Sequence, residues 1–189
     1  MTILTTGGLG FIGSNFIRKV INKSDEKIVN LDLQTYAGNA DNLKDLEGES
    51  RYSFVRGDIC HENTVNRILE EHKPWAIVNF AAESHVDRSI AGPSDFIQTN
   101  INGVFNLLNC AKKYLDAPYT DVTRFRFLQV STDEVFGSLS VDDAPFSESN
   151  QYLPNSPYAA SKASADHLVR AWFKTYGLPT LITNCSNNY

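Results

Sequence analysis

The stretch Thr6-Gly7-Gly8-Leu9-Gly10-Phe11-Ile12-Gly13 decides the fold of this chain. It follows a short β-rich run at 2–6 and opens an amphipathic run at 11–22, and its glycines are spaced G-x-x-G-x-x-G. Residues without a Cβ allow a tight turn in which backbone N–H groups approach a pyrophosphate, and the dipole of the following helix favours that anion. Gly7, Gly10 and Gly13 therefore predict a strand–loop–helix unit that binds a dinucleotide.

Asp32 ends the next β-rich run, about 20 residues after the last glycine of the loop. A carboxylate at this position can accept hydrogen bonds from both ribose hydroxyls of a dinucleotide. Leu33 and Gln34 follow it, so a 2′-phosphate would meet a negative charge with no cation beside it. The pattern favours NAD over NADP, and the alternative of an ordinary glycine-rich turn with a chance aspartate fits the context less well.

Short apolar β-rich runs alternate with longer amphipathic runs on both sides of this stretch. Strands are expected at 2–6, 27–32, 52–56, 75–80, 125–131 and 180–184, and helices at 11–22, 62–71, 95–114 and 157–176. Because parallel strands need crossover connections, the alternation predicts an α/β fold with a doubly wound parallel sheet of the Rossmann type.

The helix at 157–176 has the clearest predicted bounds. Ser156-Pro157 supplies an N-cap and a proline at the first helical position, and Gly177-Leu178-Pro179 is typical of a helix end. The runs 33–50 and 138–155 have loop chemistry, and long loops in such sheets often line the ligand crevice.

Composition excludes several classes of protein. The chain has 189 residues, 42% of them hydrophobic, with 17 basic and 22 acidic side chains and a net charge of −5. This acidic balance argues against nucleic acid as a partner, and no run approaches the ~18 apolar residues of a membrane span. Cys60, Cys110 and Cys185 form no C-x-x-C pair and are expected to be small buried residues. The scattered histidines predict no metal site.

The two ends of the sequence carry two further expectations. The N-terminus has neither a basic region nor an apolar signal core, which favours a cytoplasmic location. The sequence stops at Asn187-Asn188-Tyr189, directly after an apolar strand. We therefore expect one domain, 1–189, that is truncated at its C-terminal end.

Tyr158 and Lys162 lie at positions i and i+4 of the helix expected at 157–176, and so on one helix face. A positive charge near the phenol, together with a cationic nicotinamide ring, would lower a pKa that is ordinarily about 10 and give a usable base. A chance Y-x-x-x-K on a solvated helix is common, but the glycine loop upstream strengthens the catalytic interpretation.

Asp133 and Glu134 stand in the stretch Ser131-Thr132-Asp133-Glu134-Val135-Phe136-Gly137, at the carboxyl end of an expected strand. That end of a parallel sheet borders the ligand crevice. Two adjacent carboxyl groups can act as an acid and a base if their surroundings separate their pKa values. A solvated turn with two acids is the alternative, and the position just before the Tyr158 helix argues against it.

Three further stretches are less specific. Asp58-Ile59 follows the third strand, where a side chain could reach an adenine. An aspartate that only forms a turn is an equally good interpretation of Asp58. Phe80-Ala81-Ala82 closes the fourth strand with small residues that let a cofactor lie against the sheet edge. For His85, Asp87 and Arg88, a structural role is preferred to a catalytic one.

These motifs together resemble the extended short-chain dehydrogenase/reductase family of nucleotide-sugar enzymes. Within it the sequence is similar to the 4,6-dehydratases, over essentially the whole chain. The similar segments are 32–39 (DLQTYAGN), 81–89 (AAESHVDRS), 131–135 (STDEV) and 183–189 (TNCSNNY), of which Thr132-Asp133-Glu134 is the most specific.

The resemblance implies an NAD-dependent dehydration of dTDP-glucose. Tyr158, assisted by Lys162, would take the C4 hydroxyl proton as the C4 hydride leaves for NAD. Glu134 would then remove the C5 proton and Asp133 would protonate the departing C6 hydroxyl, before hydride returns to C6. Thr132 would bond the sugar near C4. The product would be dTDP-4-keto-6-deoxyglucose.

The resemblance also assigns binding residues and an assembly. Ser84 and Asn187, with Thr132, would contact the substrate. The cofactor site would be lined by Phe11, Ile12, Asp32, Thr35, Asp58, Ile59, Thr99, Tyr158, Lys162 and Asn188, besides the glycines and Phe80-Ala81-Ala82. Family dimers pair helices near 100–114 and 157–176, which implies a homodimer.

Two departures and two alternatives remain. Leu9 replaces a smaller residue in the glycine loop and would crowd it if it pointed inward, and Phe136 replaces a commoner tyrosine. Family members are much longer and use a C-terminal lobe to hold the nucleotide. The alternatives are a UDP-sugar epimerase or dehydratase of the same family, and a catalytically inactive NAD-binding fragment.

Overall fold

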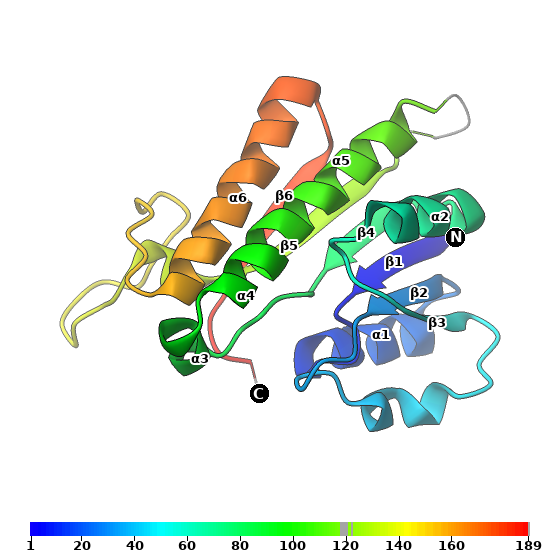
Figure 1. Ribbon diagram of the computed structural model, residues 1–189, viewed down its shortest axis with the longest axis horizontal. Helices are drawn as coiled ribbons and strands as arrows, with labels where there is room; N and C mark the ends of the chain where they lie inside the picture. Colours follow the sequence, from blue (N-terminus) through cyan, green and yellow to red (C-terminus); the bar gives the residue numbers. More distant parts are fainter. Residues whose placement is uncertain (118–120, 122, 189) are drawn as a thin grey trace.

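The structure is a computed structural model that describes residues 1–117, 121 and 123–188. In these residues, six parallel strands form a single sheet (Figure 1). Their order is β3-β2-β1-β4-β5-β6. The bounds are β1 (Thr2–Thr6), β2 (Lys27–Asp32), β3 (Tyr52–Arg56), β4 (Ala76–Asn79), β5 (Arg126–Thr132) and β6 (Thr180–Cys185). The order reverses between β1 and β4, which confirms the predicted doubly wound sheet and places its crevice there.

Helices cover both faces of the sheet. On one face, α2 (Glu62–His72), α5 (Val104–Leu115) and α6 (Pro157–Tyr176) share a core with the strands, and Figure 1 shows α5 and α6 side by side. On the other face, α1 (Phe11–Lys23) packs with the 3₁₀ segment η1 (Ala40–Leu46). The sheet is thereby held rigid behind the loops at its carboxyl edge, where small helices α3 (Val86–Ala91) and α4 (Ser94–Phe96) lie.

Local cap chemistry sets the bounds of α6 where the sequence predicted them. The Ser156 hydroxyl accepts a hydrogen bond from the Ala159 amide at 3.0 Å, and Pro157 occupies the first turn. Gly177 ends the helix in the left-handed conformation, with φ of 69°. This end-to-end agreement matters because α6 carries Tyr158 and Lys162.

The prediction of one uniform helix at 95–114 is wrong. The segment begins as α4, widens into the π-helical segment η2 (Ile97–Gly103) and continues as α5. The buried Asn100 amide explains the wide turn, since it bonds both backbone groups of Glu83 at 2.9 Å and the Ser161 hydroxyl at 2.8 Å. These partners are far away in the sequence, and π-type turns often mark functional sites.

The cysteine prediction holds for one residue of three. Cys110 is buried, whereas Cys60, in the loop between β3 and α2, and Cys185, at the end of β6, are half-buried, and all three are free thiols. In the described part of the chain no cluster of His, Cys, Asp or Glu could hold a metal ion. None of the helices described there is both long enough and apolar enough to cross a membrane.

Candidate active site at the carboxyl edge of the sheet

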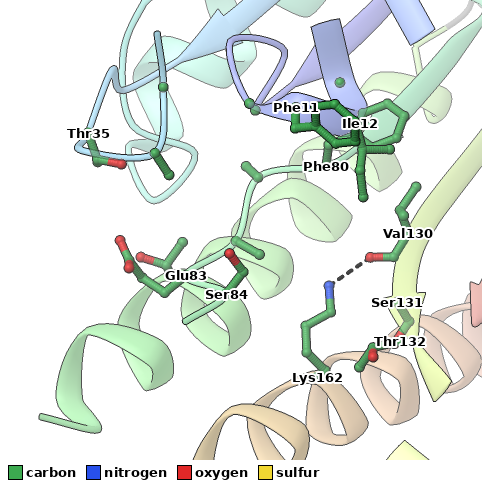
Figure 2. A pocket seen from close by; sticks show the side chains of 18 of the residues that line it. Phe11, Ile12, Thr35, Phe80, Glu83, Ser84, Val130, Ser131, Thr132 and Lys162 are labelled. Atoms are coloured by element: carbon green, nitrogen blue, oxygen red, sulfur yellow. Dashed lines mark hydrogen bonds between the residues drawn. The ribbon is translucent and has the colours of Figure 1, made fainter. Parts of the chain in front are cut away.

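A cavity of about 580 Å³ opens at the carboxyl ends of the strands. Its wall takes residues from the β1–α1 loop, from the ends of β2 to β6, from η2 and from α6. Every residue assigned a binding or catalytic role by the sequence lies on this wall: Gly7, Gly10, Phe11, Ile12, Gly13, Asp32, Thr35, Asp58, Ile59, Phe80, Ala81, Ala82, Ser84, Thr99, Thr132, Asp133, Glu134, Tyr158, Lys162, Asn187 and Asn188. Figure 2 shows Phe11, Ile12 and Phe80 opposite Lys162 and Thr132.

Two glycines allow the β1–α1 loop to close tightly against the sheet. Gly7 has φ of +67°, and a Cβ there would lie 2.5 Å from the backbone nitrogen of Ala81. A Cβ at Gly13 would lie 2.5 Å from the carbonyl oxygen of Gly7. Gly10 caps α1 without a side-chain hydrogen bond, and no acidic residue lies in the first turn. The uncapped amides and dipole of α1 therefore suit a pyrophosphate.

Leu9 does not crowd this loop. Its side chain is 3% exposed and packs in the core with Ile17 and Leu43, pointing away from the cavity. Its amide donates to Asp32 Oδ2 at 2.9 Å. The larger residue is accommodated because it faces the core behind the loop.

Asp32 joins the glycine loop to the end of β2. Besides the Leu9 amide on Oδ2, it accepts the Gln34 amide on Oδ1 at 2.7 Å. An ionised carboxylate accepts about four hydrogen bonds, so each oxygen keeps a free site toward the cavity. Among the described residues of the wall, Lys162 is the only lysine or arginine, and it lies on α6, whereas Asp32 ends β2. Asp32 thus has the surroundings expected for binding unphosphorylated ribose hydroxyls.

The carboxyl pair lies where β5 ends. Asp133 and Glu134 begin the 3₁₀ segment η3 (Asp133–Phe136), and the Thr132 hydroxyl caps it by accepting from the Glu134 amide at 3.3 Å. Partial burial, with the Asp133 carboxylate beside it, raises the pKa of Glu134. A carboxylate with a raised pKa is a stronger base than a solvated one.

Tyr158 is buried in the first turn of α6, with the ring of Phe96 edge-on at 6.3 Å. Burial, and then the Glu134 carboxylate, raise its pKa to about 12, while the Thr132 side chain opposes this. The groups of this chain alone therefore raise the phenol pKa; the predicted lowering also invoked a cationic nicotinamide ring, and it stays a prediction.

The position of the Lys162 amine explains why it does not lower the pKa of Tyr158. Its Nζ donates to the Val130 carbonyl at 2.7 Å (Figure 2), and burial lowers its own pKa to about 8. The amine is anchored on β5, and the Asp166 carboxylate favours its charged form. A lowered phenol pKa at Tyr158 requires a positive charge from a bound group.

The stretch 83–88 has mixed roles. The Arg88 guanidinium stacks 3.7 Å above the Tyr36 ring, and the Tyr36 hydroxyl donates to Glu83 at 2.8 Å. This contact agrees with the structural reading of Arg88, whereas His85 lines the cavity beside Ser84. Phe136 lies off the cavity wall and packs on Phe146.

The sequence of this chain matches a known protein family. Residues 4–189 match the family model described as GDP-mannose 4,6 dehydratase. The chain belongs to this family. It is 56% identical over its whole length to the dTDP-glucose 4,6-dehydratase of Xanthomonas campestris pv. campestris strain B100, and 52% identical to that of Salmonella typhimurium. These alignments cover 53% and 55% of the two relatives, so the chain spans about half the length of the curated relatives it matches.

A solved structure of the family has the same fold. The crystal structure of DesIV, a dTDP-glucose 4,6-dehydratase from Streptomyces venezuelae with NAD and TYD bound, matches with a TM-score of 0.90 and 46% identity. The match covers 100% of this chain and 56% of that one.

Sequence reasoning missed three residues that support the site in this family member. Asn100 ties the β4 loop to α6, Ser131 lines the cavity, and Asp166 accepts the Ser131 hydroxyl at 2.7 Å. Asp166 carries one usable signal, because it lies four residues after Lys162 on a helix face whose other residues are buried. Ser131 belongs to the similar segment 131–135 but is given no role there, and Asn100 shows no pattern of its own. Tyr189, the last residue of the similar segment 183–189, lies outside the described residues.

Proposed function

We propose that this chain is the NAD-binding domain, 1–189, of an enzyme that converts dTDP-glucose to dTDP-4-keto-6-deoxyglucose. One observation carries the proposal: the carboxyl pair Asp133-Glu134 shares a cavity wall with Tyr158 and Lys162, opposite a loop suited to a dinucleotide. The relatives at 52% and 56% identity are named for this reaction, which supports the choice of a thymidine nucleotide.

The residues of the cavity fit NAD. The uncapped N-terminus of α1 and the close approach at Gly7 and Gly13 leave room and donors for a pyrophosphate. Asp32 would hold the adenosine ribose, Asp58 and Ile59 would border the adenine, and Lys162 would reach the nicotinamide ribose. When bound, NAD supplies the hydride acceptor for C4 and the hydride donor for C6.

The groups of the chain divide the proton transfers. Tyr158 removes the C4 hydroxyl proton, with Thr132 and Ser84 orienting the sugar. The resulting 4-keto group acidifies the C5 hydrogen, which Glu134 removes, and Asp133 gives its proton to the C6 hydroxyl that departs as water. Burial, the larger cause of the raised pKa of Glu134, acts even when Asp133 is protonated, and it supports the role of Glu134 as base. C5 is then reprotonated by Glu134. Tyr158 releases the C4 hydroxyl proton to solvent and Asp133 takes up a proton from solvent, so all three residues return to their starting states.

The carboxyl pair distinguishes this reaction from C4 epimerisation. An epimerase only oxidises and re-reduces C4, and its chemistry has no elimination step that needs an acid and a base beside C5 and C6. A domain that only binds NAD would use the glycine loop and Asp32 but would have no use for Asp133 and Glu134 on the same wall.

The experiment is mass spectrometry of sugar nucleotides after the chain is incubated with NAD and an equal mixture of dTDP-glucose and UDP-glucose. We expect loss of one water from the dTDP sugar alone. Loss from the UDP sugar alone would contradict the substrate assignment. If neither sugar loses water while NAD binds, the NAD-binding module is the better interpretation.

A homodimer and a cytoplasmic location complete the proposal. Phe105 on α5, and Phe173 and Tyr176 on α6, are 45%, 47% and 53% exposed, on helices that lie side by side (Figure 1). An apolar outer surface on both helices supports a two-fold pairing through them. The absence of a membrane-crossing helix in the described residues is compatible with the proposed location.

A further inference from the structure

Asp166 is a buried carboxyl group without a part in the proton transfers proposed above. It lies one helical turn after Lys162 on α6, is 1% exposed and is not on the cavity wall. Burying a carboxyl group is costly unless hydrogen bonds or charges compensate. Its partners therefore indicate its role.

Two hydroxyl groups donate to the same oxygen of Asp166. Ser131 Oγ donates to Oδ2 at 2.7 Å, and the Tyr152 hydroxyl donates to it at 3.1 Å. Ser131 directly precedes Thr132 at the end of β5. The carboxyl group thus fixes the strand end from which the turn Thr132–Glu134 starts.

Tyr152 holds the same turn from its other side. Its ring packs edge-on against Phe136 of η3, with 5.2 Å between ring centroids. The next residue, Leu153, donates its amide to the Val135 carbonyl at 2.9 Å. The segment that covers η3 is therefore anchored to α6 through the Tyr152 hydroxyl.

A second strand end, that of β6, lies beside this group. The Asn184 amide of β6 donates to the Thr132 carbonyl at 3.2 Å, and it also lies near enough to Asp166 to lower the pKa of that carboxyl. Burial has a larger effect and raises the pKa of Asp166, whereas the positive charge of Lys162, like Asn184, lowers it. β5, β6 and the Tyr152 segment thus meet at the Asp166 side chain, and the Tyr152 segment in turn contacts η3.

We propose that Asp166 is a positioning residue, whose hydrogen bonds to Ser131 and Tyr152 hold the turn Thr132–Glu134 in place beneath Tyr158. The role given to that turn rests on the proposed function, but the ordering of the turn does not. Misplacing a catalytic group by about 1 Å can cost ~100-fold in rate, so such support matters for turnover.

Amide hydrogen exchange of this chain tests the proposal without turnover. The reporters are the amides of Gly137 and Leu153, which bond the Glu134 and Val135 carbonyls at 3.2 and 2.9 Å. We expect Asp166→Ala to speed their exchange ~10-fold or more, with the Phe80 amide of the β4 end unchanged. Asp166→Asn keeps an acceptor oxygen and should restore slow exchange.

Matched variants keep the test decisive. Ser164→Ala removes an exposed hydroxyl on the same helix and should change neither reporter. If Asp166→Ala does not fold, Ser131→Ala and Tyr152→Phe each remove one donor and should each speed exchange at both reporters. Unchanged exchange in Asp166→Ala, or in both donor variants, would overturn the proposal.

Turnover adds a second readout. Asp166→Ala should lower kcat for dTDP-glucose ~10- to 100-fold with KM within about two-fold, and Asp166→Asn should recover part of the loss. Failure of the wild-type chain to dehydrate the sugar would count against the proposed function alone. The exchange result would still decide the role of Asp166.

Discussion

Tyr158 lies in a cavity wall where burial and the Glu134 carboxylate raise its phenol pKa to about 12. A phenol in that state is a poor base at neutral pH. Lys162 cannot correct this, because its amine is bound to the Val130 carbonyl and is itself less basic than usual. The positive nicotinamide ring of oxidised NAD is the remaining source of stabilisation for a phenolate.

We therefore expect oxidised NAD to lower the pKa of Tyr158 by about one pH unit or more, and reduced NADH to have a smaller effect. Carbon-13 NMR of labelled tyrosine, assigned with Tyr158→Phe, measures this directly. Equal pKa values with the two cofactor forms would contradict the assignment of Tyr158 as the base.

The same phenol affects stability in a definite pH range. Its folded pKa lies above the unfolded value of about 10, so its contribution to stability is fully present below pH ~10 and is lost as pH rises toward about 12. Denaturant unfolding from pH 9 to 12 should show a smaller alkaline loss of stability in Tyr158→Phe than in wild type. Parallel curves would count against the raised pKa.

Glu134 and Tyr158 act at different steps, and their variants should differ accordingly. Glu134→Gln should leave NAD affinity and the appearance of NADH on mixing with substrate intact, but lower water loss by about 10²- to 10⁴-fold. Tyr158→Phe should abolish the appearance of NADH itself. Near wild-type dehydration by Glu134→Gln, measured by mass spectrometry, would remove Glu134 from the role of base.

At the scale of elements, the glycine loop and the first turn of α1 form one rigid unit. A Cβ at Gly13 would lie 2.5 Å from the Gly7 carbonyl oxygen, which is backbone and cannot turn aside. Gly13→Ala should lower NAD affinity at least ~10-fold and destabilise the fold by about 1–3 kcal/mol. Gly92→Ala is the control, because only the Arg88 carbonyl oxygen, at 4.0 Å, lies within that distance of the added atom. Calorimetric titration with NAD measures both variants.

Local patterns predicted the elements whose determinants are local. The bounds of α6 follow from Ser156, Pro157 and Gly177, and β1 to β3 follow from runs of apolar residues. The π-helical segment η2 could not be predicted, since it depends on contacts of Asn100 with Glu83 and Ser161. The direction of the Tyr158 pKa shift and the role of Asp166 were hidden for the same reason, because burial and partners come from other elements.

At the scale of the whole molecule, the exposed apolar side chains of α5 and α6 predict an assembly. Phe105→Glu places a charge in the proposed interface; its cost to the monomer is the loss of one edge-on contact with Trp172, because the side chain is otherwise 45% exposed. Light scattering after size exclusion should show a dimer for wild type and a monomer for this variant. Val141→Glu, a fully exposed apolar residue in the run 138–155, should remain dimeric. A wild-type monomer at all concentrations would contradict the proposed pairing.

In the proposed reaction, one cavity oxidises C4, removes water across C5 and C6 and returns the same hydrogen to C6. The most direct measurement follows dTDP-glucose deuterated at C4 through the reaction in ordinary water, with mass spectrometry and NMR of the product. We expect a product that has lost one water and carries the deuterium at C6. A product that has lost no water and is altered only in its configuration at C4 would contradict the proposed dehydration.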